Sequence, residues 1–257
     1  MVRHPRWACG LLLVTVILGA AGCGAAGCRP ATAPPLRIAV SANFYPTALE
    51  LAGAYQEKSA IRLELIPGSS GKHVAQIRAG APYDVLLSAD TLRPGLLARE
   101  GLASQAWIYA EGILVAWSPF GPTPAEARAS LGSPQTRVAL ANPDLAPYGL
   151  AARQVLDALE SPATRVYGEN VSQARQFTEV GSVRTGLVAL AQIPPARRSE
   201  VWMVPDSLYG RILQAAVILN ETEAAQGFLT FMRSNQAAAI IRRAGYRLEA
   251  DSATVRD

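Results

Sequence analysis

The residues with the clearest potential for chemistry stand together between positions 69 and 73. Ser69-Ser70-Gly71-Lys72 matches the pattern S-x-x-K, in which a lysine lies near the nucleophilic serine of an acyl-transferring enzyme. Such enzymes also carry an S-x-N element, and its imitation here, Ser41-Ala42-Asn43, precedes S-x-x-K instead of following it. A serine acylase using Ser69 and Lys72 is therefore only a remote alternative.

The glycine, lysine and histidine of the same segment suggest other sites, and none is complete. A phosphate-binding P-loop ending in Gly71-Lys72 would need glycine in place of Ile66 and Ser or Thr in place of His73. His73 is the only histidine beyond residue 4, and it lies on the same predicted helical turn as Ser70. We interpret it as a solvated surface group. With a single histidine and no cysteine beyond residue 28, a transition-metal cation site is not expected.

The hydroxyl groups of residues 69 and 70 lie where a predicted strand passes into a predicted helix. Alternating apolar residues over 61–66 predict the strand, and the helical spacing of Val74, Ile77 and Arg78 followed by Gly80 predicts the helix and its end. A second strand at 36–40 is followed by Ser41-Ala42-Asn43 and a helix that opens at Pro46. Helix N-termini favour anions, and open α/β sheets bind ligands at this edge.

Two acidic residues flank the next predicted strand, which covers 84–88. Asp84 is interpreted as a structural charge at the start of the strand, and Asp90 as the N-cap of the following helix. Neither is assigned to catalysis. The predicted site therefore consists of hydroxyl, amide and backbone N–H donors without a catalytic base. Such dipoles can hold a dianion without burying a countercharge, which would carry a desolvation penalty of its own.

The rest of the chain continues the alternation of strands and helices, which predicts parallel sheets with right-handed crossovers. A Pro/Gly cluster after residue 118 indicates a connection into a second lobe. The apolar segment 214–219 is expected to return to the first lobe. We therefore predict one lobe from 36–117 plus 214–250 and another from 118–213, with a cleft between them.

Residues 1–35 are predicted to be a leader and linker outside the fold. Arg3 and Arg6 precede an apolar run over 11–18, a secretory signal pattern. Ala20-Ala21-Gly22-Cys23 resembles a lipoprotein cleavage site with Cys23 as the lipidated residue, although such sites usually carry leucine where Ala20 stands. Cys28 fits about equally well, and an ordinary cleaved signal is the alternative. All three cysteines lie in this region, so the folded part is expected to contain no disulfide.

Composition and charge exclude some partners. Half of the residues are hydrophobic, which allows a sizeable core, and the formal net charge is +4. A chain beginning at Cys23 would hold 22 basic and 20 acidic residues, a net charge of +2. No basic run is interleaved with aromatic residues, so nucleic acid is not expected as a partner.

Several short motifs together resemble the extracytoplasmic molybdate-binding proteins of ABC importers, and the resemblance covers residues 36–248. Its motifs are Ala-Val-Ser-Ala-Asn-Phe at 39–44, Gly-Ser-Ser-Gly at 68–71, Gly-Ala-Pro-Tyr-Asp-Val at 80–85, Ser-Ala-Asp at 88–90, Ala-Pro-Tyr-Gly at 146–149, Glu-Asn-Val at 169–171 and Gly-Leu-Val-Ala-Leu-Ala-Gln at 186–192. The fold that this family implies is the two-lobed type II periplasmic binding protein, an α/β fold with a mostly parallel, helix-flanked sheet in each lobe.

The resemblance also implies a set of ligand contacts. The family's oxyanion-binding positions match Ala42, Asn43, Ser70, Tyr148 and Val171 in this sequence. Many members have serine or threonine where Asn43 or Ala42 stands, and Ala42 is expected to offer only its N–H. Many members also have a tyrosine near Ala189, and the hydroxyl of Tyr148 is expected to replace it.

The implied function is capture of molybdate or tungstate outside the cytoplasmic membrane, without catalysis or a cofactor. The expected partners are the oxyanion and the membrane permease of an ABC importer. The protein is expected to be a monomer in the periplasm or at the outer face of the cytoplasmic membrane, touching the membrane only through a lipid anchor. A binding protein for another tetrahedral oxyanion, such as sulfate or thiosulfate, is the main alternative.

Overall fold

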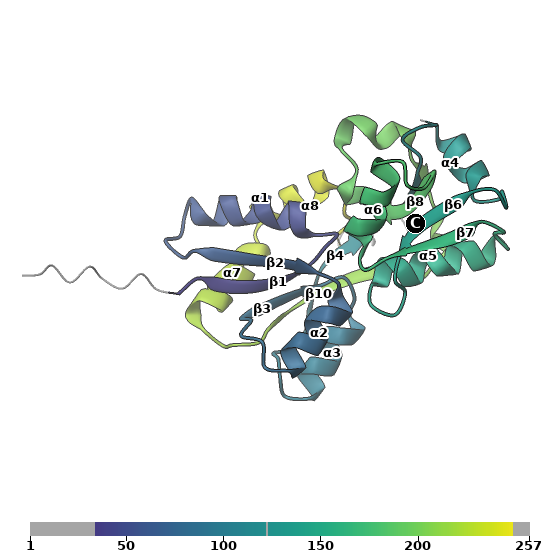
Figure 1. Cartoon of the computed structure of the whole chain (residues 1–257). Coiled ribbons are helices and arrows are strands. Elements are labelled where there is room, and N and C mark those ends of the chain that lie inside the picture. Colours follow the sequence, from purple (N-terminus) through teal and green to yellow (C-terminus); the bar gives the residue numbers. More distant parts are fainter. Residues whose placement is uncertain (1–33, 122, 249–257) are drawn as a thin grey trace, which may run out of the picture. The chain divides into compact units, whose positions relative to one another are not determined.

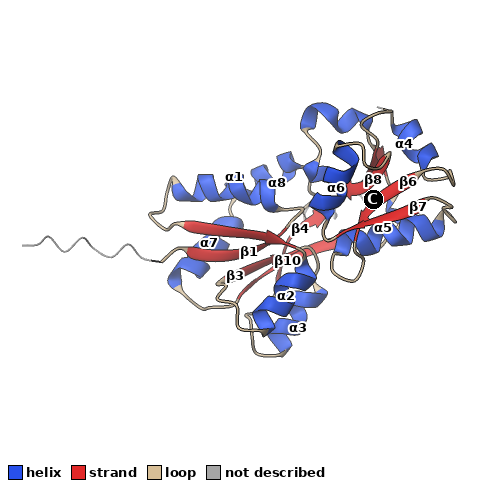
Figure 2. Cartoon of the chain, in the orientation of Figure 1, coloured by secondary structure: helices blue, strands red, loops and turns tan. Residues whose placement is uncertain are grey.

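The computed structural model describes residues 34–121 and 123–248, which form two five-stranded sheets flanked by helices (Figure 1, Figure 2). The predicted leader lies outside the described residues except for its last two positions. Cys23 and Cys28 belong to the part that is not described.

The first sheet has the strand order β2-β1-β3-β10-β4. Strand β1 runs parallel to β2 and β3, while β10 runs antiparallel to β3 and β4. Helices α1, α7 and α8 pack on one face, and α2 and α3 on the other. The elements are β1 (Leu36–Ser41), α1 (Tyr45–Gln56), β2 (Leu63–Gly68), α2 (Ser70–Arg78), β3 (Val85–Ser88), α3 (Leu92–Arg99), β4 (Trp107–Gly112), β10 (Ile212–Ile218), α7 (Glu223–Met232) and α8 (Asn235–Ala244).

The second sheet has the order β7-β6-β8-β5-β9 and repeats the same plan. Strand β6 runs parallel to β7 and β8, while β5 runs antiparallel to β8 and β9. Its elements are β5 (Leu114–Trp117), α4 (Pro124–Ser130), β6 (Arg137–Ala141), α5 (Pro147–Ala158), β7 (Thr164–Gly168), α6 (Val171–Glu179), β8 (Thr185–Ala189), β9 (Trp202–Met203) and the short 3₁₀ turns η1 (Leu190–Gln192), η2 (Pro195–Glu200) and η3 (Asp206–Leu208).

The two-lobed α/β fold predicted from the sequence is confirmed, and its sheets are mixed. In each sheet four strands run in one direction, and one strand, β10 in the first sheet and β5 in the second, runs antiparallel to its two neighbours. The parallel strands are joined by helices, whereas the chain enters β5 directly from β4 across the single residue Ile113. The prediction that α2 stops before Gly80 also holds, since Gly80 adopts the left-handed φ of +83°.

One segment belongs to the other sheet than predicted. Residues 113–117 were assigned to the first lobe, but β5 pairs with β8 and β9 of the second sheet. Strand β4, which the sequence reasoning did not identify, takes the place beside β10. All four residues of β5 are buried. A short, wholly apolar strand carries no alternation, so its sequence does not reveal which sheet it joins.

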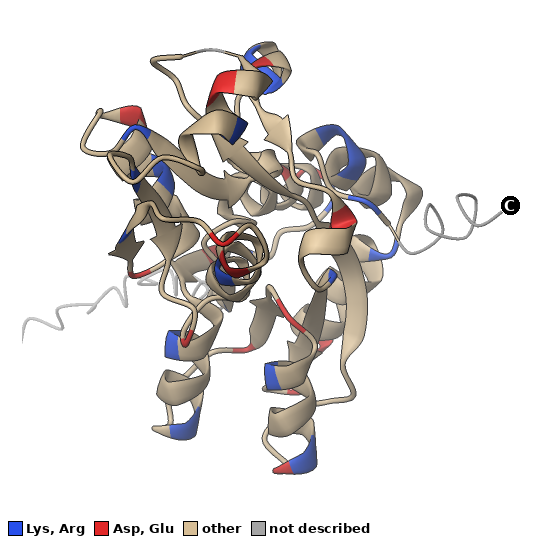
Figure 3. Ribbon diagram, turned by 90° about the vertical axis from the view of Figure 1, so that its right-hand side faces the viewer, with Lys and Arg blue, Asp and Glu red and all other residues tan. Residues whose placement is uncertain are grey.

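The chain therefore passes between the sheets at Ile113 and again between η3 and β10. Within the described residues, no helix has the length and hydropathy needed to cross a bilayer. Figure 3 shows acidic and basic residues interspersed over the helices and loops, which agrees with the small net charge.

Candidate functional site

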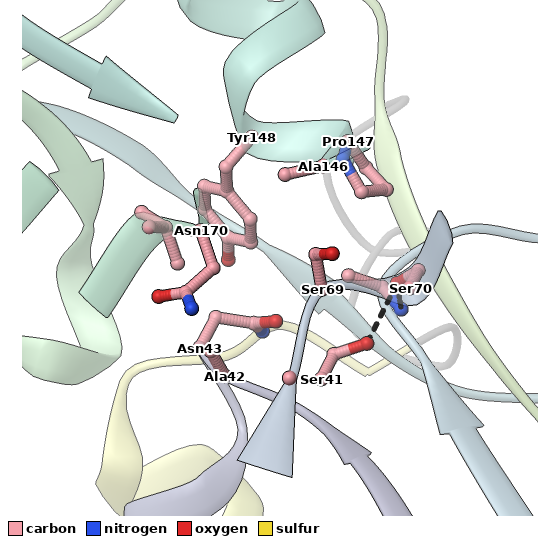
Figure 4. A pocket seen from close by; sticks show the side chains of 12 residues that line it. Ser41, Ala42, Asn43, Ser69, Ser70, Ala146, Pro147, Tyr148 and Asn170 are labelled. Carbon is pink, nitrogen blue, oxygen red and sulfur yellow. Dashed lines mark hydrogen bonds between the residues drawn. The ribbon is translucent and has the colours of Figure 1, made fainter. Parts of the chain in front are cut away.

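A small cavity lies where the carboxyl ends of strands from both sheets pass into helices (Figure 4). Three of these helices begin at lining residues, namely α2 at Ser70, α5 at Pro147 and α6 at Val171, while α1 begins two residues after Asn43. The lining residues are Ser41, Ala42, Asn43, Gly68, Ser69, Ser70, Ala89, Ala146, Pro147, Tyr148, Asn170 and Val171. Four helix N-termini, each the positive end of a helix dipole, thus face one cavity.

Local sequence explains why each helix starts at this point. The hydroxyl of Ser69 accepts the N–H of Lys72, and the side chain of Asn170 accepts the N–H of Gln173. Both are N-caps, which satisfy one first-turn donor and leave the N–H groups before it available. Pro147 opens α5 with its φ already suited to a helix and has no N–H that needs a partner.

Ser70 shares a short hydrogen bond with a second serine at the end of β1. Its Oγ lies 2.7 Å from Ser41 Oγ and also accepts the N–H of Ala89 at 3.0 Å. One proton of the two hydroxyl groups is used between them, whichever serine donates it. The other proton remains available to a ligand in the cavity.

The side chain of Asn43 points away from the role that the resemblance implies. Its Nδ2 donates to Gln214 Oε1 at 2.9 Å and to the hydroxyl of Tyr246 at 3.2 Å. Both amide protons are therefore used inside the first lobe. The group that Asn43 can offer to the cavity is its backbone N–H, which has no hydrogen-bond partner in the described part of the chain.

Ala42 lines the cavity, but its N–H donates to the carbonyl of Gly68 at 2.8 Å. The expectation that this N–H faces a ligand is therefore not met, because strand pairing between β1 and β2 extends one residue beyond the end of β1. The carbonyl of Ala42 accepts bonds from Ser172 Oγ at 3.1 Å and Gln192 Nε2 at 3.2 Å. Ala42 thus connects the first lobe with α6 and η1 of the second.

Tyr148 and Val171 supply the second lobe's share of the lining. The Tyr148 side chain is only 1% exposed, and burial raises the pKa of its hydroxyl well above the ordinary value, so it remains protonated. Within residues 34–121 and 123–248, the N–H groups of Ser70, Tyr148 and Val171 donate to no protein acceptor. Together with the N–H of Asn43, they form a set of unused backbone donors.

No charged side chain lines this cavity in the described chain. Its 12 lining residues include no Asp, Glu, Lys, Arg or His. The cavity measures about 10 Å³, about the space that one water molecule needs, which leaves no room for a sugar or a peptide. No group of three or more His, Cys, Asp or Glu side chains that could hold a metal ion occurs in the part that the structure describes.

The nearest lysine is used elsewhere, which weighs against acyl transfer. Lys72 Nζ lies 2.8 Å from Glu169 Oε1, across from α2 in the second lobe. The hydrogen bond and the charge of Glu169 raise the pKa of Lys72, which favours the charged amine over the neutral form that a base needs. The Ser69 hydroxyl is occupied as an N-cap. S-x-x-K here is a helix start, not a nucleophile and its base.

Comparison with known proteins now identifies the family. The family model described as "Bacterial extracellular solute-binding protein" matches residues 36–247. The chain belongs to this family.

Relatives of this solute-binding protein include two described as molybdate-binding protein ModA. The one from Rhodobacter capsulatus is 38% identical over 229 residues, covering 86% of this chain and 91% of the relative. The one from Azotobacter vinelandii is 34% identical over 243 residues, covering 90% and 96%. The solved periplasmic molybdate-binding protein of Azotobacter vinelandii superimposes with a TM-score of 0.75 at 36% identity, covering 83% of this chain and 99% of that structure.

The structure brings all five sequence-predicted contact residues, Ala42, Asn43, Ser70, Tyr148 and Val171, to this one cavity. The sequence reasoning did not select Ser41, Asn170 or Gln214. Ser41 follows an apolar strand just as Ser70 does, so its position carried a signal. Asn170 is an N-cap type of residue one position before a predicted helix, which was a second signal. Gln214 stands at the edge of an apolar run and gave none.

His73 is buried, contrary to the prediction of a solvated side chain. It is 1% exposed and lies beneath Gly68, with its Nε2 3.2 Å from the carbonyl of Val40. Burial lowers the pKa of His73, which keeps it neutral near pH 7. A methyl group at Gly68 would stand 2.8 Å from the imidazole ring. The absence of a side chain at Gly68 therefore makes room for this histidine.

Both aspartates have structural roles, but the N-cap of α3 is Thr91 and not Asp90 as predicted. Asp84 accepts the N–H of Arg37 at 2.7 Å and an amide N–H of Asn220 at 3.0 Å. Asp90 accepts the N–H of Arg93 at 2.8 Å and pairs with the guanidinium of the same residue.

Proposed function

We propose that this solute-binding protein captures molybdate, or the similar dianion tungstate, outside the cytoplasmic membrane and delivers it to an ABC importer. The observation that carries the proposal is the charge-free cavity on which four helix N-termini converge. The relatives at 34% and 38% identity, which are described as molybdate-binding, support the choice of ligand.

The lining suits a tetrahedral dianion because it offers several hydrogen-bond donors and no negatively charged acceptor. Backbone N–H groups, a serine hydroxyl and a protonated phenol can surround the oxygens of an anion from several directions. The ligand keeps its charge, and the helix dipoles stabilise it. A protonated oxyanion such as hydrogen phosphate would need an acceptor for its own proton, and the lining offers no carboxylate.

The proposed contacts refine those implied by the resemblance. Asn43 and Val171 act through their N–H groups, and Ser70 acts through its N–H and the hydroxyl that it shares with Ser41. Tyr148 contributes its hydroxyl. Ala42 contacts the ligand without donating to it, because its N–H is bonded to Gly68.

The remaining parts of the proposal concern location and assembly. Secretion by the leader places the protein in the periplasm or at the outer face of the cytoplasmic membrane, and lipidation of Cys23 anchors it. The partner is the permease of the importer, and the protein acts as a monomer. The two lobes, 36–112 plus 212–248 and 114–210, move about the crossings at Ile113 and near residue 211.

Calorimetric titration of the purified mature protein with molybdate, tungstate, sulfate and phosphate tests the function. We expect tight binding of molybdate and tungstate, far weaker binding of sulfate, and none of phosphate. A molybdate-dependent rise in melting temperature should accompany it, because the ligand binds only the folded protein. Equal or tighter binding of sulfate would transfer the proposal to sulfate, and binding of no oxyanion would overturn it.

A further inference from the structure

A chain of buried polar side chains connects the core of the first lobe to the cavity. It runs from the backbone carbonyl of Asn43 through Tyr246, the Asn43 side chain and Gln214 to the hydroxyl of Tyr148. All four side chains are almost completely buried, and Gln214 has no exposed surface. Water therefore does not compete for these bonds, and each group must find its partner within the chain.

The direction of the chain is set at its inner end. A carbonyl oxygen can only accept, so the single proton of the Tyr246 hydroxyl is used in the 2.8 Å bond to the carbonyl of Asn43. Toward the Asn43 side chain, the same hydroxyl oxygen must then accept. The group of Asn43 that faces it at 3.2 Å is therefore the NH₂ and not the oxygen.

The orientation of the Asn43 amide in turn fixes the orientation of the Gln214 amide. The second Nδ2 proton of Asn43 goes to Gln214 Oε1 at 2.9 Å, and the hydroxyl of Tyr109 lies 3.0 Å from the same oxygen. With Oε1 accepting on this side, the NH₂ of Gln214 faces Tyr148, 3.5 Å from its hydroxyl oxygen. The hydroxyl of Tyr148 thus accepts from Gln214 and retains its own proton for another acceptor.

The opposite orientation of the two amide groups would disfavour anion binding. If both amides were reversed, the hydroxyl of Tyr148 would donate to Gln214 and present only lone pairs to the cavity. The reversal would also place Asn43 Oδ1 against the Tyr246 oxygen, whose single proton is already used. Two oxygens without a proton between them repel each other, so the network disfavours this state.

We propose that Gln214 is a positioning residue that makes the hydroxyl of Tyr148 an obligatory donor to the oxyanion, with Tyr246 and Asn43 fixing the orientation of its amide. The inference rests on the proposed function for the nature of the ligand. Gln214 belongs to β10 of the first sheet and Tyr148 to α5 of the second lobe. The donor role of Tyr148 is therefore imposed by the opposite lobe.

Gln214→Glu is the sharpest test, because it keeps the size of the side chain and replaces its donor by an acceptor. When the carboxylate is ionised, Tyr148 should donate to it and lose its proton for the ligand. We expect molybdate affinity to fall at least tenfold at pH 8 and to recover partly toward pH 6, since burial raises the pKa of a carboxyl group. The wild-type protein should show no such pH profile.

A double-mutant cycle separates this effect from charge repulsion between the new carboxylate and the dianion. Repulsion alone should cost the same affinity whether residue 148 is tyrosine or phenylalanine. If Gln214 acts through the Tyr148 hydroxyl, the loss of molybdate affinity caused by Gln214→Glu should be at least threefold smaller in the Tyr148→Phe protein than in the wild type. Equal losses in both backgrounds would overturn the proposal.

A milder variant and a ligand-free measurement complete the test. Tyr246→Phe releases the amide of Asn43, and should weaken binding severalfold only when Tyr148 is present. Without ligand, the tyrosine Fermi doublet in Raman difference spectra against Tyr148→Phe reports whether Tyr148 donates or accepts. It should change from acceptor to donor in Gln214→Glu. If the Raman doublet of Tyr148 does not change in Gln214→Glu, the proposed role of Gln214 is overturned even if molybdate binds. If the doublet changes as expected but no oxyanion binds, only the proposed function is overturned.

Discussion

The polar side chains in the first lobe's half of the cavity are held by hydrogen bonds within that lobe, whereas the Tyr148 hydroxyl in the second lobe's half is not. Ser41, Ser70 and the side chain of Asn43 are bonded to groups of the first lobe. In the second lobe, the Tyr148 hydroxyl has its only described hydrogen bond with Gln214 of the first. The first half is thus formed in advance, while the second depends on contact between the lobes.

Other contacts between the lobes surround the cavity. The N–H of Gly71 donates to the carbonyl of Leu145 at 2.9 Å, and Arg93 donates to the carbonyl of Asp144 at 2.8 Å. Ser172 reaches the carbonyl of Ala42. These contacts use backbone carbonyls as acceptors rather than paired charges. Their formation depends on how closely the lobes approach and hardly on the protonation of either one.

Gly112→Ala should disturb the second half most strongly. A methyl group at this position would stand 2.1 Å from the hydroxyl of Tyr148 and 2.8 Å from Gln214 Nε2, so the phenol must move. We expect calorimetry to show at least a hundredfold loss of molybdate affinity. Gly53→Ala is the matched control, since nothing lies within 4 Å of the added methyl group and α1 should gain about 0.5–1 kcal/mol. Wild-type affinity in Gly112→Ala would remove Tyr148 from the site.

Ser70→Ala tests the half that is formed in advance. Removal of a hydrogen bond to a charged ligand should weaken binding by about 1.5–3 kcal/mol. The loss should lie near the lower limit, because Ser41 keeps its hydroxyl and can turn it toward the ligand. Ser69→Ala is the control and should cost less affinity, since that hydroxyl caps α2. If the two variants bind equally well, Ser70 acts only through its N–H.

His73, which packs behind the first lobe's half of the cavity, should make the stability of the protein depend on pH. Its pKa is lowered in the folded protein, so the unfolded chain takes up the proton first as the pH falls. The free energy of unfolding should therefore decrease as the pH drops below about 6.5, the ordinary histidine pKa. Denaturant titrations of His73→Gln should show a smaller decrease between pH 7 and 5. An equal decrease in both proteins would assign the effect to other groups.

The ion pair between Lys72 and Glu169 should contribute little, although it joins the two lobes. Both side chains are about half exposed, so water and salt screen the attraction between their charges. Lys72→Met should change molybdate affinity less than threefold, and any change should vanish in high salt. A tenfold loss that persists in salt would show that the charge acts on the ligand directly.

The smallest expected effect is that of pH on the molybdate affinity of the wild-type protein. The cavity lining has no group that titrates near neutrality, and Tyr148 remains protonated. Molybdate affinity of the wild-type protein should therefore be almost constant from pH 6 to 8. A tenfold change over this range would require an ionisable group in contact with the ligand, and both halves of the cavity would then need revision.

The junctions between strands and helices were predictable because their signals are local. Ser69, Pro147 and Asn170 are helix-start residue types that follow apolar segments, and short-range rules recognise them. The positions of Asn43 and Ser70 at one sheet edge followed from the parallel order of β1 and β2.

The directions of side chains and the partner of a short apolar strand were not predictable. The burial of His73 depends on β1, where its Nε2 meets the carbonyl of Val40, 33 residues away, and the orientation of Asn43 depends on Tyr246, which is 203 residues away. The placement of β5 depends on β8 and β9. Each is decided by contacts that are distant in the sequence, about which the residue types at one position carry little information.

The charge-free lining also determines how the cavity can be emptied. A site that holds its cargo through ionised side chains can discharge it when those groups gain or lose a proton. Here the donors of the lining keep their protons over the natural pH range, so a change of pH does not weaken binding and cannot release the ligand. Unloading must come from separation of the lobes, which withdraws Gln214 from Tyr148 and removes two of the four helix ends at once. Release of the ligand thus depends on a movement of the lobes and not on a change of protonation.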